Sequence, residues 1–193
     1  PYDQVIPILA DAEHASWTQG AQSAVVWTRP EAVSSTFAGL LRGGPADLGR
    51  LAAEVDRYVQ LLVEAGPRVR LLLAPTWVVP THRRGLGMAD LRPGGVGHAL
   101  IAMNGRLVAA LAADSHVYVL DAQKWCAKAG DKAFDPRLWY MGKIPFGPEV
   151  FKAAVADLKA AMEKIGLRCP HSYLARTLEE ADKAVDEIGF PVI

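Results

Sequence analysis

Charged and aromatic residues crowd into one short stretch of the sequence, which reads DPRLWYMGKIPFGPEVF and leads into a predicted helix. Asp135, Arg137, Tyr140 and Lys143 fall within nine residues of one another. Side chains of these types hold anions or move protons. Two interpretations follow: Lys143 contacts an anionic group in a cleft, or it pairs with Asp135 at the surface, where such a pair contributes only about 0–1 kcal/mol.

A second set of candidate residues lies in the Gly- and Pro-rich stretch 75–97. His82, Arg83 and Arg92 precede a predicted helix, whose free N–H groups and dipole favour an anion. A phosphate, of a phosphopantetheine arm or of a phosphoglycerate, fits that chemistry. The alternative is that the arginines of this stretch, Arg83, Arg84 and Arg92, lie in solvent or pair with Asp90.

Further candidates follow the predicted strands. Arg29 and Glu31 come after the first strand, Trp77 after the second and Asp121 after the third. Ligands of open α/β sheets bind at the carboxyl ends of the strands, so these positions are candidates for ligand contacts. Trp77 could equally pack on the core, and Asp121 could cap a turn.

The elements that must position these residues alternate along the chain. Short apolar runs predict strands, and apolar residues three and four apart predict helices. The alternation favours a parallel sheet with helices on both faces, because parallel strands need crossover connections. The predicted strands cover 23–27, 69–74 and 116–120, and two predicted helices cover 48–62 and 96–111. A last long helix is predicted to start at Pro148. Its predicted buried face consists of Phe151, Val155, Leu158, Met162 and Ile165.

Composition narrows the class of protein. The chain has 193 residues, 51% of them hydrophobic, which suffices for one substantial core. Its 21 basic residues balance its 21 acidic ones, so no overall field favours nucleic acid or an acidic membrane surface. No run approaches the roughly 20 apolar residues of a membrane-spanning helix. Cys126 and Cys169 are far apart and lack metal-ligand spacing, so we expect no metal site and a reducing, cytoplasmic location.

From residue 1 to about residue 161 the sequence resembles the amino-terminal, SGNH-hydrolase-like domain of FkbH-like proteins. The motifs that carry the resemblance are PYDQ at 1–4, VVWTRPEA at 25–32, HRRGLGM at 82–88, DLRPGG at 90–95 and LWYMGKIPFG at 138–147. The resemblance implies a three-layer α/β/α sandwich of flavodoxin-like type with a mainly parallel sheet. It also implies a role in loading a glyceryl unit from a phosphorylated three-carbon donor onto an acyl carrier protein.

The chain departs from that family's catalytic pattern. The nucleophilic serine and the family's first strand are expected upstream of Pro1. SGNH hydrolases carry an Asp-x-x-His pair before the last helix, whose histidine acts as a base. Here Tyr140 and Lys143 occupy those places, and they are the weak catalytic candidates. A lysine is a poor base at neutral pH unless burial lowers its pKa. A dehalogenase-type Asp-x-Asp motif is missing as well.

The carboxyl-terminal segment resembles another family. The runs MEKIGL at 162–167, RTLEEA at 176–181 and EIGFPVI at 187–193 resemble the entry to an ATP-grasp domain of the carbamoyl-phosphate-synthetase type. The segment ends before the parts that hold ATP, so we expect no cofactor. The sequence therefore predicts an SGNH-like domain over 1–166, lacking its first strand, and a βαβ-like appendage over 167–193 that could supply strands to the sheet.

Three functional hypotheses remain. The first is a noncatalytic module that binds an acyl carrier protein or a phosphorylated small molecule in glyceryl-transfer biosynthesis. Its predicted ligand-binding residues are Arg29, Trp77, His82, Arg83, Arg92 and Lys143. The second is an SGNH-type esterase or acyltransferase whose nucleophile lies upstream of this chain. The third is a truncated or recombined scaffold without activity. A sheet without its first strand exposes an unpaired edge, which favours a homo-oligomer.

Overall fold

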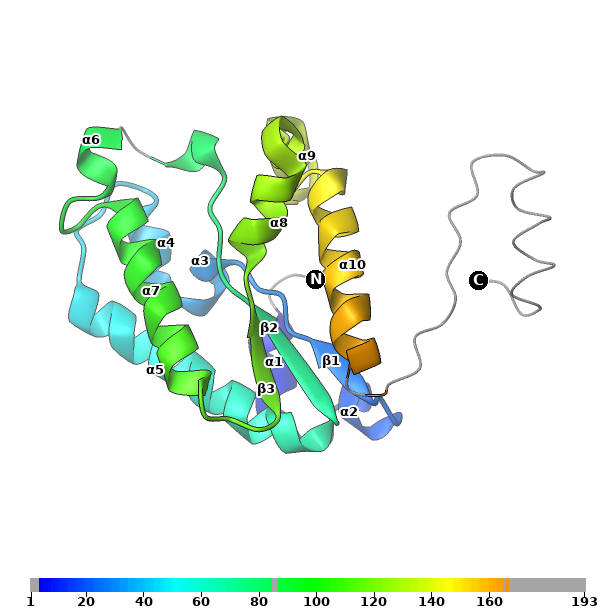
Figure 1. The fold of residues 1–193 in the computed structure, drawn as a ribbon. Coiled ribbons are helices and arrows are strands. Elements are labelled where there is room, and N and C mark those ends of the chain that lie inside the picture. Colours follow the sequence, from blue (N-terminus) through cyan, green and yellow to red (C-terminus); the bar gives the residue numbers. More distant parts are fainter. Residues whose placement is uncertain (1–3, 85–86, 165, 167–193) are drawn as a thin grey trace, which may run out of the picture. The chain divides into compact units, whose positions relative to one another are not determined.

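Three short parallel strands lie at the centre of the fold (Figure 1). The computed structural model describes residues 4–84, 87–164 and 166, and the chain divides into two units, Pro1–Phe151 and Lys152–Ile193. In the first unit the strands lie in the order β1 (Ser23–Val25), β2 (Leu71–Pro75) and β3 (Val117–Leu120). The predicted mixed α/β class with a parallel sheet is confirmed.

The middle strand, β2, is buried on both faces. Successive side chains of a strand point to opposite faces of the sheet. Leu72 and Ala74 belong to the main hydrophobic core, and Leu71 and Leu73, which face the other way, are buried as well. This continuous apolar run is typical of a parallel strand that is covered on both sides.

Two long helices, α5 (Leu48–Ala65) and α7 (Val96–Leu111), lie side by side and pack on the core (Figure 1). The Asp47 carboxylate caps α5 by accepting a 2.9 Å hydrogen bond from the Arg50 N–H. Both helices agree with the predicted periodicity except at their first residues, since Leu48 is exposed and Val96 only partly buried. The other apolar residues at three- and four-residue spacing are buried: Leu51, Val55, Val59, Leu62, Leu100, Met103, Leu107 and Leu111.

Shorter helices fill the connections. Among the described residues these are α1 (Val5–Ala10), α2 (Ala15–Thr18), α3 (Pro30–Val33), α4 (Ser35–Leu40), α6 (Gly87–Asp90), α8 (Ala122–Ala129) and α9 (Pro136–Gly142). Periodicity did not predict them, because one or two turns carry too few apolar positions to show a period. Asp121 caps α8 by accepting from the N–H groups of Gln123 and Lys124, the structural alternative that the sequence offered.

The last helix among the described residues, α10 (Pro148–Lys164), starts at the predicted residue. Its predicted buried face is wrong by about one position, since Val150 is buried whereas Phe151 and Val155 are exposed. Apolar residues lie on more than one side of this helix, so the pattern alone did not select the buried side. The predicted appendage over 167–193 lies outside the described residues. No helix in the described part of the chain is both long and apolar enough to cross a membrane.

The start of α7 depends on a buried carboxylate. Asp90 is only 5% exposed, and it accepts hydrogen bonds from the Arg84 guanidinium and, at 2.9 Å, from the Gly97 N–H. The hydrogen bond from Arg84 lowers the pKa of Asp90, although burial opposes the shift. The predicted alternative that a loop arginine pairs with Asp90 is thus confirmed for Arg84. A Cβ atom at position 97 would collide with the Asp90 carboxylate and the Arg84 guanidinium.

Two glycines of α7 form a matched pair for a stability test. Gly97→Ala should lower the free energy of unfolding by about 1–3 kcal/mol, because the added methyl group must displace the Arg84–Asp90 pair. Gly105→Ala should raise it by up to about 1 kcal/mol, because a Cβ there meets open space and alanine favours helix. Urea denaturation followed by circular dichroism measures both, and equal effects of the two substitutions would contradict the packing around Asp90.

Candidate functional site

Three cationic side chains surround one tryptophan. Trp139 on α9 is 8% exposed, and the guanidinium carbon of Arg83 lies 4.1 Å from its ring centroid. The guanidinium carbon of Arg29 and the Nζ atom of Lys143 each lie 5.6 Å from that centroid. These distances are within the range of cation–π attraction. We call Arg29, Glu31, Arg83, Trp139 and Lys143 the Trp139 cluster.

The members of the cluster come from three separate parts of the chain. Arg29 is the residue before the first turn of α3, just past β1, and Arg83 ends a 3-10 turn (Thr81–Arg83) beyond β2. Lys143 ends α9 in the left-handed conformation, with φ at 55°. Its N–H donates to the Trp139 carbonyl oxygen at 2.9 Å, which closes the last turn of the helix.

The cluster carries more positive than negative charge. Glu31 pairs with Arg83, with 2.5 Å between the carboxylate oxygen Oε1 and the nitrogen Nη1, and both side chains are mostly buried. The Lys143 side chain is exposed. Cations outnumber carboxylates three to one among these side chains, so the cluster favours an anion over a cation.

An apolar cavity adjoins the cluster. Its volume is about 190 Å³, and Arg29 is one of the residues that line it. The other lining residues are Val5, Trp27, Thr28, Val78, Ile144, Pro145, Phe146 and Phe151. The ring of Trp27 lies 5.4 Å from that of Phe146 and 5.5 Å from that of Phe151, measured between centroids, so aromatic carbon forms much of the wall.

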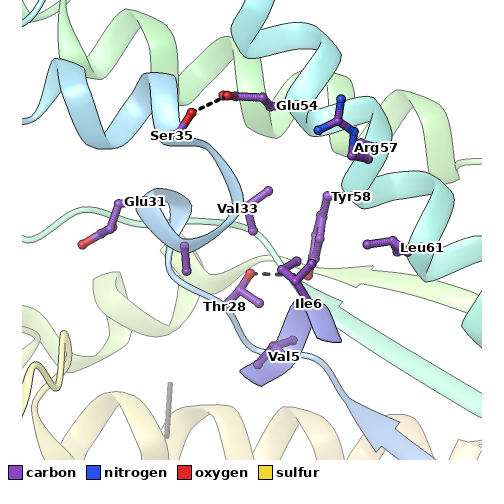
Figure 2. A pocket seen from close by; sticks show the side chains of 11 residues that line it. Val5, Ile6, Thr28, Glu31, Val33, Ser35, Glu54, Arg57, Tyr58 and Leu61 are labelled. Atoms are coloured by element: carbon purple, nitrogen blue, oxygen red, sulfur yellow. Dashed lines mark hydrogen bonds between the residues drawn. The ribbon is translucent and has the colours of Figure 1, made fainter. Parts of the chain in front are cut away.

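A second and larger cavity, of about 510 Å³, lies between α1, α3 and α5 (Figure 2). Tyr58 is only 3% exposed and lies at this cavity, where its hydroxyl accepts a 3.4 Å hydrogen bond from the Thr28 hydroxyl. Burial, opposed by that hydrogen bond, raises the pKa of Tyr58 to about 12.

Glu54 lines the same cavity but is engaged in holding α4. Its carboxylate accepts hydrogen bonds from the hydroxyls of Ser34 at 2.5 Å and Ser35 at 2.7 Å, and from the Thr36 N–H at 3.2 Å. Figure 2 shows the bond from Ser35. Burial acts to raise the pKa of Glu54, but these hydrogen bonds outweigh it and lower the pKa. A carboxylate held in this way fixes the helix start and has little capacity left for a ligand.

The structure brings together Arg29, Arg83 and Lys143 from the set of predicted ligand-binding residues. His82 and Arg92 have exposed side chains and do not belong to the cluster. The Tyr140 side chain is 73% exposed, although it neighbours Trp139 in the chain. Asp135, the alternative partner for Lys143, instead caps α9 by accepting from the Arg137 N–H at 2.9 Å.

Trp77 packs in the hydrophobic core, as the second of its two sequence interpretations predicts. It is 1% exposed, and its indole N–H donates to the Thr28 hydroxyl at 3.0 Å. Its backbone N–H donates to the Asn104 Oδ1 atom at 2.8 Å, and its carbonyl oxygen accepts from Asn104 Nδ2 at 2.9 Å. A contact between Trp77 and a ligand stays a prediction.

Sequence reasoning missed three residues that shape the site. It assigned no role to Thr28 or Asn104, and it did not place Trp139 among cations. Asn104 left a signal, because a polar amide follows Met103 and Leu100 close to the apolar face of its helix. The pairing of Trp139 with Arg29 and Arg83 left none, since these two arginines are distant from Trp139 in the sequence.

Comparisons with known proteins match only a short carboxyl-terminal segment. The large chain of carbamoyl phosphate synthase from Neisseria meningitidis serogroup A is 51% identical over 35 residues, which are 18% of this chain and 3% of that protein. The corresponding protein of Gemmatimonas aurantiaca is 64% identical over 33 residues, or 17% of this chain and 3% of that protein. The N-terminal section of the large chain from Aquifex aeolicus is 57% identical over 35 residues, 18% of this chain and 6% of that protein.

The predicted resemblance of the carboxyl-terminal segment to carbamoyl phosphate synthase is thus confirmed for about 35 residues. The chain spans only 3–6% of the length of these relatives. No family model matches the chain, and no solved structure matches it. The resemblance of residues 1–161 to FkbH-like proteins stays a prediction.

The buried phenol of Tyr58 predicts a loss of stability at high pH. Between pH 10 and 12 the unfolded chain releases the phenolic proton while the folded chain keeps it, so stability falls as the pH rises. Tyr58→Phe removes this loss. Between pH 9 and pH 11 its free energy of unfolding should rise relative to the parent chain by about 1 kcal/mol. Urea denaturation at both pH values measures the difference.

Tyr118 supplies the control, because it lies exposed on β3. The pH dependence of Tyr118→Phe should follow that of the parent chain. Parallel pH profiles for Tyr58→Phe and the parent would show that burial does not hold the proton on Tyr58.

Proposed function

We propose that the first unit is a noncatalytic module that binds the phosphate group of a small molecule at the Trp139 cluster. The observation that carries this proposal is the convergence of Arg29, Arg83 and Lys143 on one indole. Guanidinium groups bind phosphate through paired hydrogen bonds, and an ammonium group adds a point charge. The indole packs against all three cations, and Glu31 competes with the ligand for Arg83.

The proposal excludes catalysis by the chemistry of the cluster. Neither an indole nor a guanidinium group serves as a nucleophile, and Glu31 is occupied by Arg83. The Lys143 side chain is exposed, so it lacks the enclosed site in which a lysine acts as base or nucleophile. The exposed Tyr140 side chain lacks the enclosure that tunes a catalytic acid or base. This favours the binding hypothesis over that of an esterase or acyltransferase, whose nucleophile the family resemblance places upstream of this chain.

The resemblance to FkbH-like proteins supplies a finer form of the proposal. In that form the ligand is a phosphorylated three-carbon compound, and the module serves glyceryl transfer to an acyl carrier protein in the cytoplasm. The same resemblance proposes a three-layer sandwich, and the burial of β2 on both faces supports it. Carbamoyl phosphate synthesis is not part of the proposal, because the match covers only 3–6% of those relatives.

Titration calorimetry with 3-phosphoglycerate tests the proposal. Arg83→Ala should weaken binding about tenfold or more, because it removes a charge-assisted hydrogen bond. Arg92→Ala is the matched control, since this arginine is exposed and lies outside the cluster. Absence of binding to the parent chain at millimolar concentration, or equal losses for the two variants, would overturn the proposal.

Substitution of Glu31, whose carboxylate competes with the ligand for Arg83, should change the affinity in the opposite direction. Glu31→Gln removes the anion that occupies Arg83, so it should strengthen binding of 3-phosphoglycerate by severalfold. Arg106 and Asp56 form an exposed ion pair elsewhere on the first unit, and Asp56→Asn should leave binding unchanged. Weaker binding by Glu31→Gln than by the parent would show that Glu31 supports the site instead of competing for it.

A further inference from the structure

The Trp139 cluster and the apolar cavity are continuous in the chain and in space. Arg29 contributes to both. Lys143 is followed directly by Ile144, Pro145 and Phe146, which line the cavity. A ligand whose anionic group lies against the cations therefore has its adjoining atoms next to the cavity.

The wall of the cavity suits an apolar group. Seven of its nine lining residues are aliphatic, aromatic or proline, and the exceptions are Thr28 and Arg29. The Thr28 hydroxyl is already engaged, because it accepts from the Trp77 indole N–H at 3.0 Å and donates to the Tyr58 hydroxyl at 3.4 Å. A polar group placed here would lose its hydrogen bonds to water without regaining them, whereas an apolar group gains from burial.

The volume of the cavity sets the size of that group. An engineered apolar cavity of about 150 Å³ takes up benzene. A volume of about 190 Å³ therefore accommodates a group of about the size of one aromatic ring or a short branched acyl chain. Longer chains would have to leave through the rim.

We infer that the ligand is an amphipathic anion, with a phosphate group at the Trp139 cluster and a ring-sized apolar group in the cavity lined by Trp27 and Phe146. The inference rests on the proposed function and adds to it the class of ligand. It favours a phosphate ester of an apolar group over a phosphorylated sugar or glycerate, whose hydroxyls find no partner in the cavity wall. It keeps the phosphate site of the proposed function, which every one of these ligands would occupy, and replaces only the three-carbon form of the ligand.

Two probes, phenyl phosphate and inorganic phosphate, separate the claim of an anion site from the claim that an apolar group binds in the cavity. Both carry the anion, and only phenyl phosphate carries the ring. Titration calorimetry on the full chain should show phenyl phosphate binding at least about tenfold more tightly, as burial of a ring predicts. In NMR spectra the indole N–H signals of Trp27 and Trp139 should shift with phenyl phosphate. The signal of Trp17 should not, since its indole donates to the Ile8 carbonyl oxygen at 2.8 Å, away from the cavity.

Substitutions that fill the cavity give a second measurement. Val78→Phe and Ile144→Phe should each abolish the advantage of phenyl phosphate while leaving the affinity for inorganic phosphate unchanged. Val108→Phe is the control for the added ring, because Val108 lies exposed on α7 and does not line the cavity. The Val108→Phe variant should bind phenyl phosphate more tightly than inorganic phosphate by the same factor as the parent chain does.

The outcomes distinguish the two proposals. Equal affinities for phenyl phosphate and inorganic phosphate, both lost in Arg83→Ala, would overturn the amphipathic ligand and leave the anion site in place. Binding of neither probe would overturn the anion site as well. A phenyl phosphate advantage that survives both cavity substitutions would place the ring elsewhere and also overturn the inference.

Discussion

The arrangement of the site depends on how the backbone of Trp77 finds hydrogen-bond partners after β2 ends. A buried N–H or C=O group without a partner costs about 1–3 kcal/mol. The side-chain amide of Asn104 satisfies both groups of Trp77, as a neighbouring strand would. This fixes the chain beyond β2 against α7. The segment that follows, which carries Val78 and Arg83, therefore leaves the sheet in a defined direction.

The same tryptophan fixes the end of β1. Its indole N–H donates to the Thr28 hydroxyl, and Thr28 directly precedes Arg29. Trp77 thus links the two segments that deliver Arg29 and Arg83 to Trp139. Its ring also packs against Tyr58, with 5.5 Å between centroids, which connects this link to α5 and the main core. A core tryptophan in this protein thus acts on the candidate site by fixing the positions of these two segments.

Local sequence patterns made the strands and the long helices predictable, but only part of the site. The apolar period of α5 and α7 and the apolar run of β2 lie within single segments, so the sequence displays them directly. The Arg83–Glu31 pair joins residues 52 positions apart. Composition could not show that Arg84 pairs with Asp90 while Arg83 pairs with Glu31, since adjacent arginines look alike in sequence. Only the course of the loop beyond Trp77 separates their roles.

The Arg83–Glu31 pair offsets part of the repulsion within the cationic cluster. Three cations around one indole repel one another, and burial of Arg83 removes part of the water that would screen them. Glu31 places a negative charge beside the Arg83 guanidinium and so neutralises part of its charge. In the proposed function an anion would replace Glu31 as the partner of Arg83. Its affinity would reflect the difference between the two partners, so a dianionic phosphate would compete with Glu31 better than a carboxylate would.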